Sequence, residues 1–268
     1  METGQPSRTA YSAARYRAAH QILEGGRIFT DPLAIPILGL TEAELLVDAP
    51  RRAMRVFIAA RSRFAEDALA AAVGRGVRQV VVLGAGLDTF GYRNPFPDVR
   101  VIEVDHPATQ GWKRDRLADA GISIPTTLTY VGVDFERESL ADRLRLDGPA
   151  FFLWLGVVPY LTRAGFDETL AFVAAVDGNE VVFDYAQSPE RMSPERRAAL
   201  EARASRVASI GEPWLTYFEP AEIAGILSSF REIEDLGPAQ LASRFFGRHD
   251  LPPDTPGGHL LRAVSAGR

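Results

Sequence analysis

Two glycines and two acidic side chains are spaced as a nucleoside-binding site would need them. Gly84 and Gly86 flank Ala85 directly after a short β-branched run, and glycines there allow a sharp turn and leave room for a ligand. Glu103 and Asp105 follow Gly84 by 19 and 21 residues. An acid about 20 residues beyond a glycine loop is placed to hold a ribose hydroxyl pair. The spacing predicts an adenosine site. The same residues would also suit a plain tight turn followed by two solvated strand ends.

A third acid extends the series. Asp134 ends the next apolar segment, where it could accept from an adenine amino group while the Phe135 ring lies against the base. The third glycine of dinucleotide-binding loops, which lets a helix approach the strand around a pyrophosphate, is missing. A cofactor with adenosine but no phosphate, S-adenosylmethionine, therefore fits better than a nicotinamide dinucleotide.

The elements that position these residues alternate from residue 77 to residue 186. β-branched apolar runs and helical stretches follow one another, which predicts βαβ units and a parallel sheet buried on both faces. Ligands of such sheets bind beyond the carboxyl ends of the strands. We expect strands at 79–83, 99–104, 127–133, 151–158, 181–185, 231–236 and 259–265, and helices at 11–23, 48–73, 107–120, 136–146, 162–176, 191–210 and 219–230.

No stretch has the composition of a linker between domains. We therefore expect one domain spanning residues 1–268. Its four parts are a helical cap (1–75), a cofactor-binding core (76–186), a lid insertion (187–218) and the C-terminal strands (219–268).

The composition is that of an ordinary globular protein. The 268 residues are 46% hydrophobic and 24% charged, contain no cysteine and carry a formal net charge of -5. The absence of cysteine excludes disulfides, thiol catalysis and cysteine-bound metals. The negative charge disfavours nucleic-acid and anionic-membrane partners. No apolar run is long enough to span a membrane, and the polar start lacks a secretory signal, so we expect a cytoplasmic protein.

Several blocks together resemble the leucine carboxyl methyltransferase family, whose bacterial members include S-adenosylmethionine-dependent O-methyltransferases. The similar segments are RQVVVLGAGLDTFGYR (78–93), IEVDHP (102–107), VDF (133–135), FTDPLA (29–34) and ARSRF (60–64). The resemblance implies an α/β fold of class I methyltransferases. Its Rossmann-like sheet has seven strands in the order 3-2-1-4-5-7-6, here with an N-terminal helical layer and an inserted helical lid.

The resemblance also implies site residues. The loop of Gly84, Ala85 and Gly86 would pass under the methionine part of the cofactor. Asp105, with Glu103, would hold the ribose, and Asp134 with Phe135 the adenine. Arg61, and either Arg15 or Arg17, would reach the cofactor carboxylate, which a guanidinium can bind through two hydrogen bonds. Many family members carry a glutamate in the fourth strand, and residues 153–161 (LWLGVVPYL) contain none.

Methyl transfer to a carboxylate needs no general base, because a carboxyl group is already ionised near pH 7. We accordingly predict no catalytic residue. A phenol or alcohol acceptor would need a base, for which His106 is the nearest candidate. His20, His249 and His259 show no pairing pattern, and we expect no metal site.

The acceptor is predicted from aromatic side chains that could line or cover a pocket: Tyr160, Tyr185, Trp214 and Tyr217. They favour a small apolar carboxylic acid of polyketide-like character and a role in secondary metabolism. A protein C-terminal carboxylate and a homodimer stay open. Two other functions remain as alternatives: a nicotinamide-dependent oxidoreductase, and a non-catalytic binding protein with a nucleotide fold.

Overall fold

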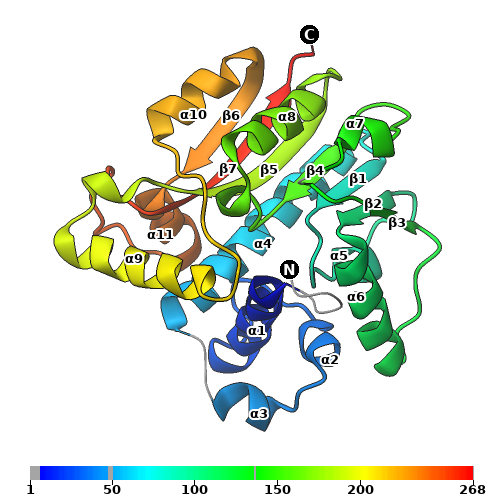
Figure 1. The fold of residues 1–268 in the computed structure, drawn as a ribbon, viewed down its shortest axis with the longest axis horizontal. Coiled ribbons are helices and arrows are strands. Elements are labelled where there is room, and N and C mark those ends of the chain that lie inside the picture. Colours follow the sequence, from blue (N-terminus) through cyan, green and yellow to red (C-terminus); the bar gives the residue numbers. More distant parts are fainter. Residues whose placement is uncertain (1–6, 48–50, 136, 268) are drawn as a thin grey trace. The chain divides into compact units, whose positions relative to one another are not determined.

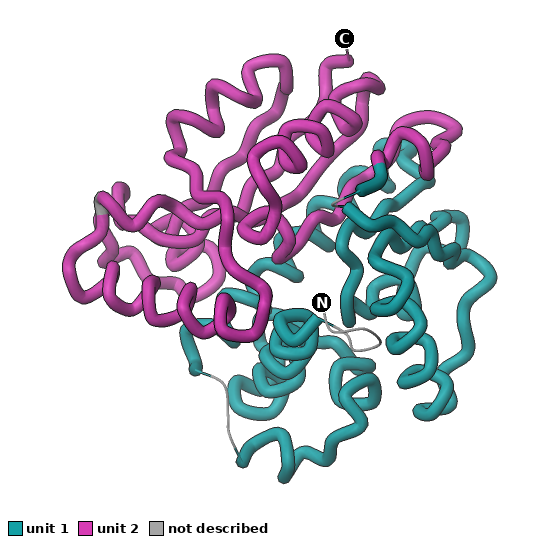
Figure 2. Tube along the Cα trace, in the orientation of Figure 1, with its two compact units in different colours: residues 1–138 teal, residues 139–268 magenta. Residues whose placement is uncertain are grey.

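The computed structural model describes residues 7–47, 51–135 and 137–267. Helices and strands alternate through the middle of the chain, as the sequence predicts (Figure 1). Contacts divide the chain into two compact units, residues 1–138 and residues 139–268 (Figure 2). The expected single domain with its four parts stays a prediction.

Unit 1 carries the glycine loop and the predicted cofactor residues. Its strands pair in parallel, with Val81 opposite Ile102 and Ile102 opposite Thr129, so their carboxyl ends share one edge. Its elements are α1 (Arg8–Leu23), α2 (Ala34–Leu38), α3 (Glu42–Val47), α4 (Arg52–Gly74), β1 (Gln79–Leu83), α5 (Phe90–Arg93), β2 (Arg100–Asp105), α6 (Pro107–Asp119) and β3 (Leu128–Gly132). The predicted start of the α4 helix at residues 48–50 lies outside the described residues.

Unit 2 holds the other strands. β4 and β5 are parallel, whereas β7 is antiparallel to both β5 and β6. Its helices and strands are α7 (Leu140–Arg143), β4 (Phe151–Trp154), α8 (Arg163–Ala174), β5 (Glu180–Ala186), α9 (Pro194–Ala208), α10 (Pro220–Ile226), β6 (Phe230–Leu236), α11 (Pro238–Phe246) and β7 (Gly258–Ser265). Single 3₁₀ turns lie at 158–160, 189–191 and 227–229.

The strand order is β3-β2-β1-β4-β5-β7-β6, which confirms the predicted order and the antiparallel seventh strand. Mixed order with one antiparallel strand near the edge is common in large α/β sheets. Among the described helices, none combines the length and the apolar character that a membrane crossing requires.

The structure corrects three sequence predictions. The fourth strand ends at Trp154, not Val158, because Gly156 adopts a φ of 75° and a 3₁₀ turn follows. The expected helix 136–146 is reduced to α7. The helix α11 was not predicted, although Pro238 at its start and Gly247 in the left-handed conformation at its end are ordinary helix signals.

The helical layer of unit 1 packs on the glycine loop. Ala14, Ala18 and Ala19 of α1 are fully buried, and small side chains let the helix approach its neighbours closely. They share one apolar cluster with Leu87, which directly follows the glycine loop. The N-terminal helices therefore help to support the loop as well as cover it.

An aromatic cluster forms the core of unit 2. Phe166 of α8 is fully buried, and its ring centroid lies 5.4 Å from Trp154, 4.6 Å from Phe218 and 5.8 Å from Phe183. Aromatic pairs at such distances add to the free energy of burial. The cluster joins β4, β5 and α8, which carry much of the packing of this unit.

Replacing Phe166 by alanine is expected to lower the free energy of unfolding by about 3–5 kcal/mol, because it empties a closely packed aromatic core. Urea denaturation followed by tryptophan fluorescence measures the loss. Phe246→Ala, at a ring that is 37% exposed, is the control and should change stability by less than about 1 kcal/mol. Equal effects of the two substitutions would contradict the assignment of Phe166 to the core.

Candidate functional site

The glycine loop and the end of β2 are joined by one carboxylate. Gly84 and Gly86 have φ angles of 60° and 47°, a backbone conformation that glycine adopts without strain. Asp105 Oδ2 accepts a hydrogen bond from the Gly86 amide at 2.5 Å, and its Oδ1 accepts from the His106 amide at 2.6 Å. The register brings Leu83 beside Val104, so this contact follows directly from strand pairing.

The electrostatics of Asp105 suit a ligand that donates hydrogen bonds. Burial raises the pKa of its carboxyl group, and the amides of Gly86 and His106 oppose that rise. A carboxylate has about four lone-pair sites, so two remain beside the two amide bonds. A sugar diol can satisfy both. Asp105 and the two turned glycines therefore fit a nucleoside.

Glu103 has a different environment. Its side chain is fully buried, and its Oε2 lies 2.6 Å from the Lys113 ammonium of α6, a partner that the sequence reading missed. Burial raises the pKa of Glu103 to about 7, although the Lys113 charge opposes the rise. Its Oε1 has no hydrogen-bond partner in the described part of the chain. The ion pair links β2 to α6. Asp105 is therefore the acid that remains for a ribose.

Asp134 and Phe135 follow β3 at the same strand edge. Val133 donates its amide to the Asp105 carbonyl at 2.9 Å, so the two strand ends are in contact. The Asp134 carbonyl accepts from the amides of Arg137 and Glu138, which forms a turn. The Asp134 side chain is 31% exposed, and Phe135 is half-buried. Asp134 and Phe135 therefore follow a strand end that is in backbone contact with Asp105.

The structure separates the two N-terminal arginines. Arg17 donates from Nε to Asp31 at 2.9 Å and from its terminal nitrogen to the Leu87 carbonyl at 2.5 Å. It therefore supports the glycine loop. Arg15 lies half-buried on the same helix and is the better candidate for the cofactor carboxylate, together with Arg61, which is 7% exposed on α4.

Asp31 is the centre of a buried charge network. It is fully buried between Arg17 and Arg93, whose Nε lies 3.6 Å from Oδ1, and Arg93 also pairs with Glu66. Burial alone would raise the pKa of Asp31, but the two guanidiniums hold it below its usual range. Arg93 further donates to Thr89 Oγ1 at 3.0 Å. Two arginines thus link Asp31 to Leu87 and Thr89, on the segment that leaves the glycine loop.

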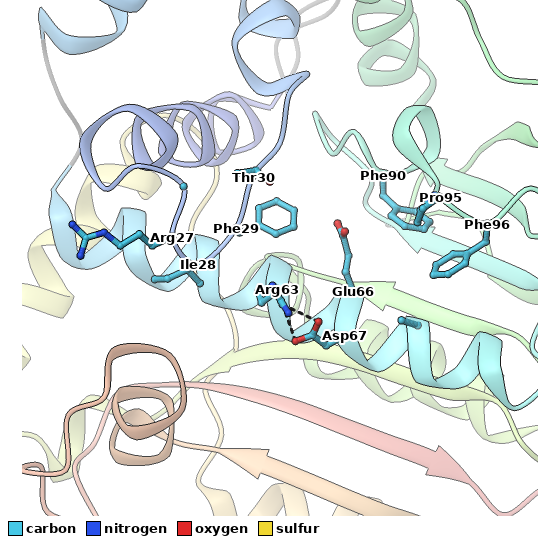
Figure 3. Close-up of a pocket in the computed structure, with 12 residues that line it drawn as sticks. Arg27, Ile28, Phe29, Thr30, Arg63, Glu66, Asp67, Phe90, Pro95 and Phe96 are labelled. Atoms are coloured by element: carbon cyan, nitrogen blue, oxygen red, sulfur yellow. Dashed lines mark hydrogen bonds and ion pairs between the residues drawn. The ribbon is translucent and has the colours of Figure 1, made fainter.

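A cavity of about 340 Å³ lies beside this network (Figure 3). Its walls include Phe29, Phe90 and Phe96, and Figure 3 shows the Glu66 carboxylate directed into it and Arg63 paired with Asp67 at its side. None of the predicted cofactor residues lines it. The cavity is therefore separate from the predicted nucleoside site.

Of the predicted acceptor residues, Tyr185 is placed in the core of unit 2. It is 2% exposed, and its hydroxyl donates to Asp235 at 2.7 Å. Trp214 and Tyr217 make an edge-to-face contact at 6.1 Å in the segment after α9. That segment is anchored next to Tyr160, because the Leu215 amide donates to the Pro159 carbonyl at 2.7 Å. Trp214, Tyr217 and Tyr160 are half-buried and keep surface for a ligand.

Two other polar residues are explained by the structure. His106 caps α6, because its Nδ1 accepts from the Ala108 amide at 3.2 Å. Asp184 was not predicted. It is 6% exposed in β5, and its carboxylate accepts from the Gly156 amide at 2.5 Å. An acid inside an otherwise apolar strand was the signal. It holds the turn after β4, in the stretch that lacks the expected glutamate.

Comparison with known proteins gives a family and a set of relatives. Residues 10–174 match the leucine carboxyl methyltransferase family. The chain is 34% identical over 200 residues to "Putative S-adenosyl-L-methionine-dependent methyltransferase YktD" of Bacillus subtilis, covering 70% of this chain and 65% of that protein. A "Putative S-adenosyl-L-methionine-dependent methyltransferase" of Mycolicibacterium paratuberculosis is 30% identical over 243 residues, covering 85% of this chain and 42% of that protein. The chain thus spans less than two thirds of either relative.

Solved structures share the fold at low identity. A "putative methyltransferase" from Thermobifida fusca superposes with a TM-score of 0.56 at 17% identity, covering 99% of this chain and 97% of that one. Magnesium protoporphyrin IX methyltransferase from Synechocystis, crystallised with bound S-adenosylhomocysteine, gives 0.51 at 12% identity, covering 94% of this chain and 99% of that one. Both likenesses support the predicted class I methyltransferase fold.

Glu103→Gln tests the buried ion pair through pH. The pKa of Glu103 is raised from 4.5 unfolded to about 7 folded, so its contribution to stability is complete below pH 4.5 and is lost as pH rises towards 7. The variant should lack this decline when urea midpoints at about pH 5 and about pH 8 are compared. Glu234→Gln, at a side chain that is 40% exposed, should keep the wild-type decline. A decline in Glu103→Gln as steep as the wild type's would contradict the prediction.

Asp31→Asn tests the support of the glycine loop. Affinity for S-adenosylhomocysteine should fall about tenfold, which corresponds to the loss of about one charged hydrogen bond. Affinity for 5′-deoxyadenosine, which lacks the amino acid, should stay within about twofold of its wild-type value. Calorimetric titration measures both.

The matched control is Arg55→Gln, which breaks a pair with Glu24 in the same helical layer, where the two side chains are 9% and 13% exposed. It should leave both affinities unchanged. If Asp31→Asn weakened the two ligands alike, the network would be a general structural element with no selective effect on the loop.

Proposed function

The chain belongs to the leucine carboxyl methyltransferase family, and from this premise we propose that it methylates a carboxylate oxygen of a small apolar metabolite. S-adenosylmethionine is the cofactor of this family and supplies the methyl group from its sulfonium. The observation that carries the proposal is the contact between Asp105 and the turned glycine loop. It brings a half-buried acid and a loop of two glycines around one alanine to one strand edge, where ligands of such sheets bind.

Each part of the cofactor has residues that suit it. Asp105 accepts hydrogen bonds from the ribose, and Asp134 with Phe135 binds the adenine. The backbone of Gly84, Ala85 and Gly86 borders the methionine part. The cofactor carboxylate is bound by the guanidinium of Arg61 and by that of Arg15, since Arg17 already bonds Asp31 and Leu87.

For this reaction the protein has mainly to align the methyl donor with the acceptor and to exclude water. An acceptor carboxylate is ionised near pH 7 and attacks without a base, and good orientation of two reactants contributes about 7–11 kcal/mol. No catalytic side chain is therefore assigned. Tyr160, Trp214 and Tyr217 present aromatic surface that suits an apolar acid, such as one of polyketide type.

Calorimetry with Asp105→Ala tests the cofactor site. The wild-type protein is expected to bind S-adenosylmethionine and S-adenosylhomocysteine and not NAD. The variant should bind at least about a hundredfold more weakly, because two hydrogen bonds to a charged group are lost. Asp115→Ala, at an exposed acid of α6, is the control and should bind normally. Binding of NAD alone would favour an oxidoreductase, and binding of neither nucleoside would end the methyltransferase proposal.

The acceptor class is tested by incubating the protein with S-adenosylmethionine and small aromatic and aliphatic carboxylic acids. The expected product is a methyl ester, seen by mass spectrometry and removed by mild alkali. The absence of an alkali-labile methyl ester with every acid, in a protein that binds S-adenosylmethionine, would contradict carboxylate methylation.

A further inference from the structure

Three side chains of unit 2 form a polar cluster that the proposed function does not use. His259 of β7 places Nδ1 2.8 Å from Asp235 Oδ1, and Tyr185 donates its hydroxyl to Asp235 Oδ2 at 2.7 Å. The His259 and Tyr185 rings stack at 4.7 Å with an interplanar angle of 23°. The sequence showed no partner for His259. Only strand pairing, which sets Tyr185 opposite His259, brings the three together.

The cluster selects one form of the imidazole. A carboxylate only accepts hydrogen bonds, so the neutral His259 ring must carry its proton on Nδ1 and keep a lone pair on Nε2. Burial and the neighbouring Asp235 raise the pKa of Tyr185, so its hydroxyl stays a donor. Both oxygens of Asp235 thus have a donor. The carboxylate orients the ring in the way that catalytic histidines are oriented.

The other edge of the ring, which carries Nε2, makes no hydrogen bond to a described group. No described protein group bonds Nε2, and the His259 side chain is 10% exposed. Gly237, where α11 begins, faces this edge, since an added Cβ there would lie 2.9 Å from Cε1 and 3.3 Å from Nε2. A contact that only linked β5 to β6 would need no more than the Tyr185–Asp235 hydrogen bond. The imidazole adds a proton acceptor, Nε2, to which no group in the described part of the chain is bonded.

The location and the charges define the ligand. Tyr185 is near the carboxyl end of β5, Asp235 near that of β6 and His259 near the start of antiparallel β7, so all three lie at the strand edge where ligands bind. The charges that act on Tyr185 are those of Asp235 and Glu219, both negative. They disfavour a ligand that brings its own negative charge, whereas proton transfer from a neutral ligand to Nε2 leaves the net charge of the site unchanged. A neutral molecule with an acidic hydroxyl, such as a phenol or enol, suits the site.

We infer that the Asp235–His259 pair is a proton-accepting subsite that binds phenolic or enolic hydroxyl groups. Nε2 accepts the hydroxyl proton as the oxygen becomes nucleophilic. The proton moves from the ligand oxygen to Nε2 and returns to the oxygen when the ligand leaves, so the step balances without a further reactant.

The binding of 4-nitrophenol tests the subsite without cofactor or turnover, so failure here leaves the methyltransferase proposal standing. Its acidity is close to that of imidazole, and its phenolate absorbs at longer wavelength than the phenol. The wild-type protein should show a saturable rise of the phenolate band at constant pH. His259→Gln should abolish the rise, and His249→Gln, at an exposed histidine of the same unit, should keep it. No saturable rise, or an equal rise in His259→Gln, would overturn the inference.

A second measurement needs no variant that could fail to fold. Nitrogen NMR of the ¹⁵N-histidine-labelled wild-type protein should show one ring with a protonated Nδ1 and an unprotonated Nε2, and the Nε2 signal should move when 4-nitrophenol is added. A ring with the opposite tautomer would also overturn the inference.

Discussion

The Asp105 carboxylate is the contact on which the candidate cofactor site depends. One side chain at the end of β2 holds the Gly86 amide of the loop after β1 and the His106 amide at the start of α6. Because parallel pairing sets these strand ends side by side, the half-buried acid lies where it can accept from both amides. The glycine loop needs this contact, since its left-handed turns bring no side chains of their own.

The N-terminal helices support the same loop from the other side. Arg17, Asp31 and Arg93 form a buried network that ends on the Leu87 carbonyl and on Thr89, while alanines of α1 pack beside Leu87. Buried charges are tolerated only when they are paired, so the network is constrained to one geometry. The helical layer is thus a part of the loop's support, and changes in either affect the other.

The hydrogen-bond and ion-pair partners of each acidic residue decide its role. Glu103 and Asp105 lie two residues apart on one strand, yet Glu103 is committed to Lys113 and Asp105 to backbone amides. Asp235 likewise orients the His259 ring through Nδ1, and Asp184 stabilises the turn after β4. In each case the chemistry of the residue follows from its neighbour across the sheet or helix, which residue type alone does not reveal.

The sequence by itself determined the class of fold, the strand order implied by the family resemblance, and the glycine–acid–acid series of Gly86, Asp105 and Asp134. These depend on short-range patterns: apolar strands, turn glycines and strand-terminal acids. Only the tertiary structure decided that Arg17 pairs with Asp31, that Glu103 pairs with Lys113, that Tyr185 is a core residue and that His259 has a carboxylate partner. Those pairs lie 10 to 24 residues apart along the chain and meet through strand register and helix packing, which single residues do not encode.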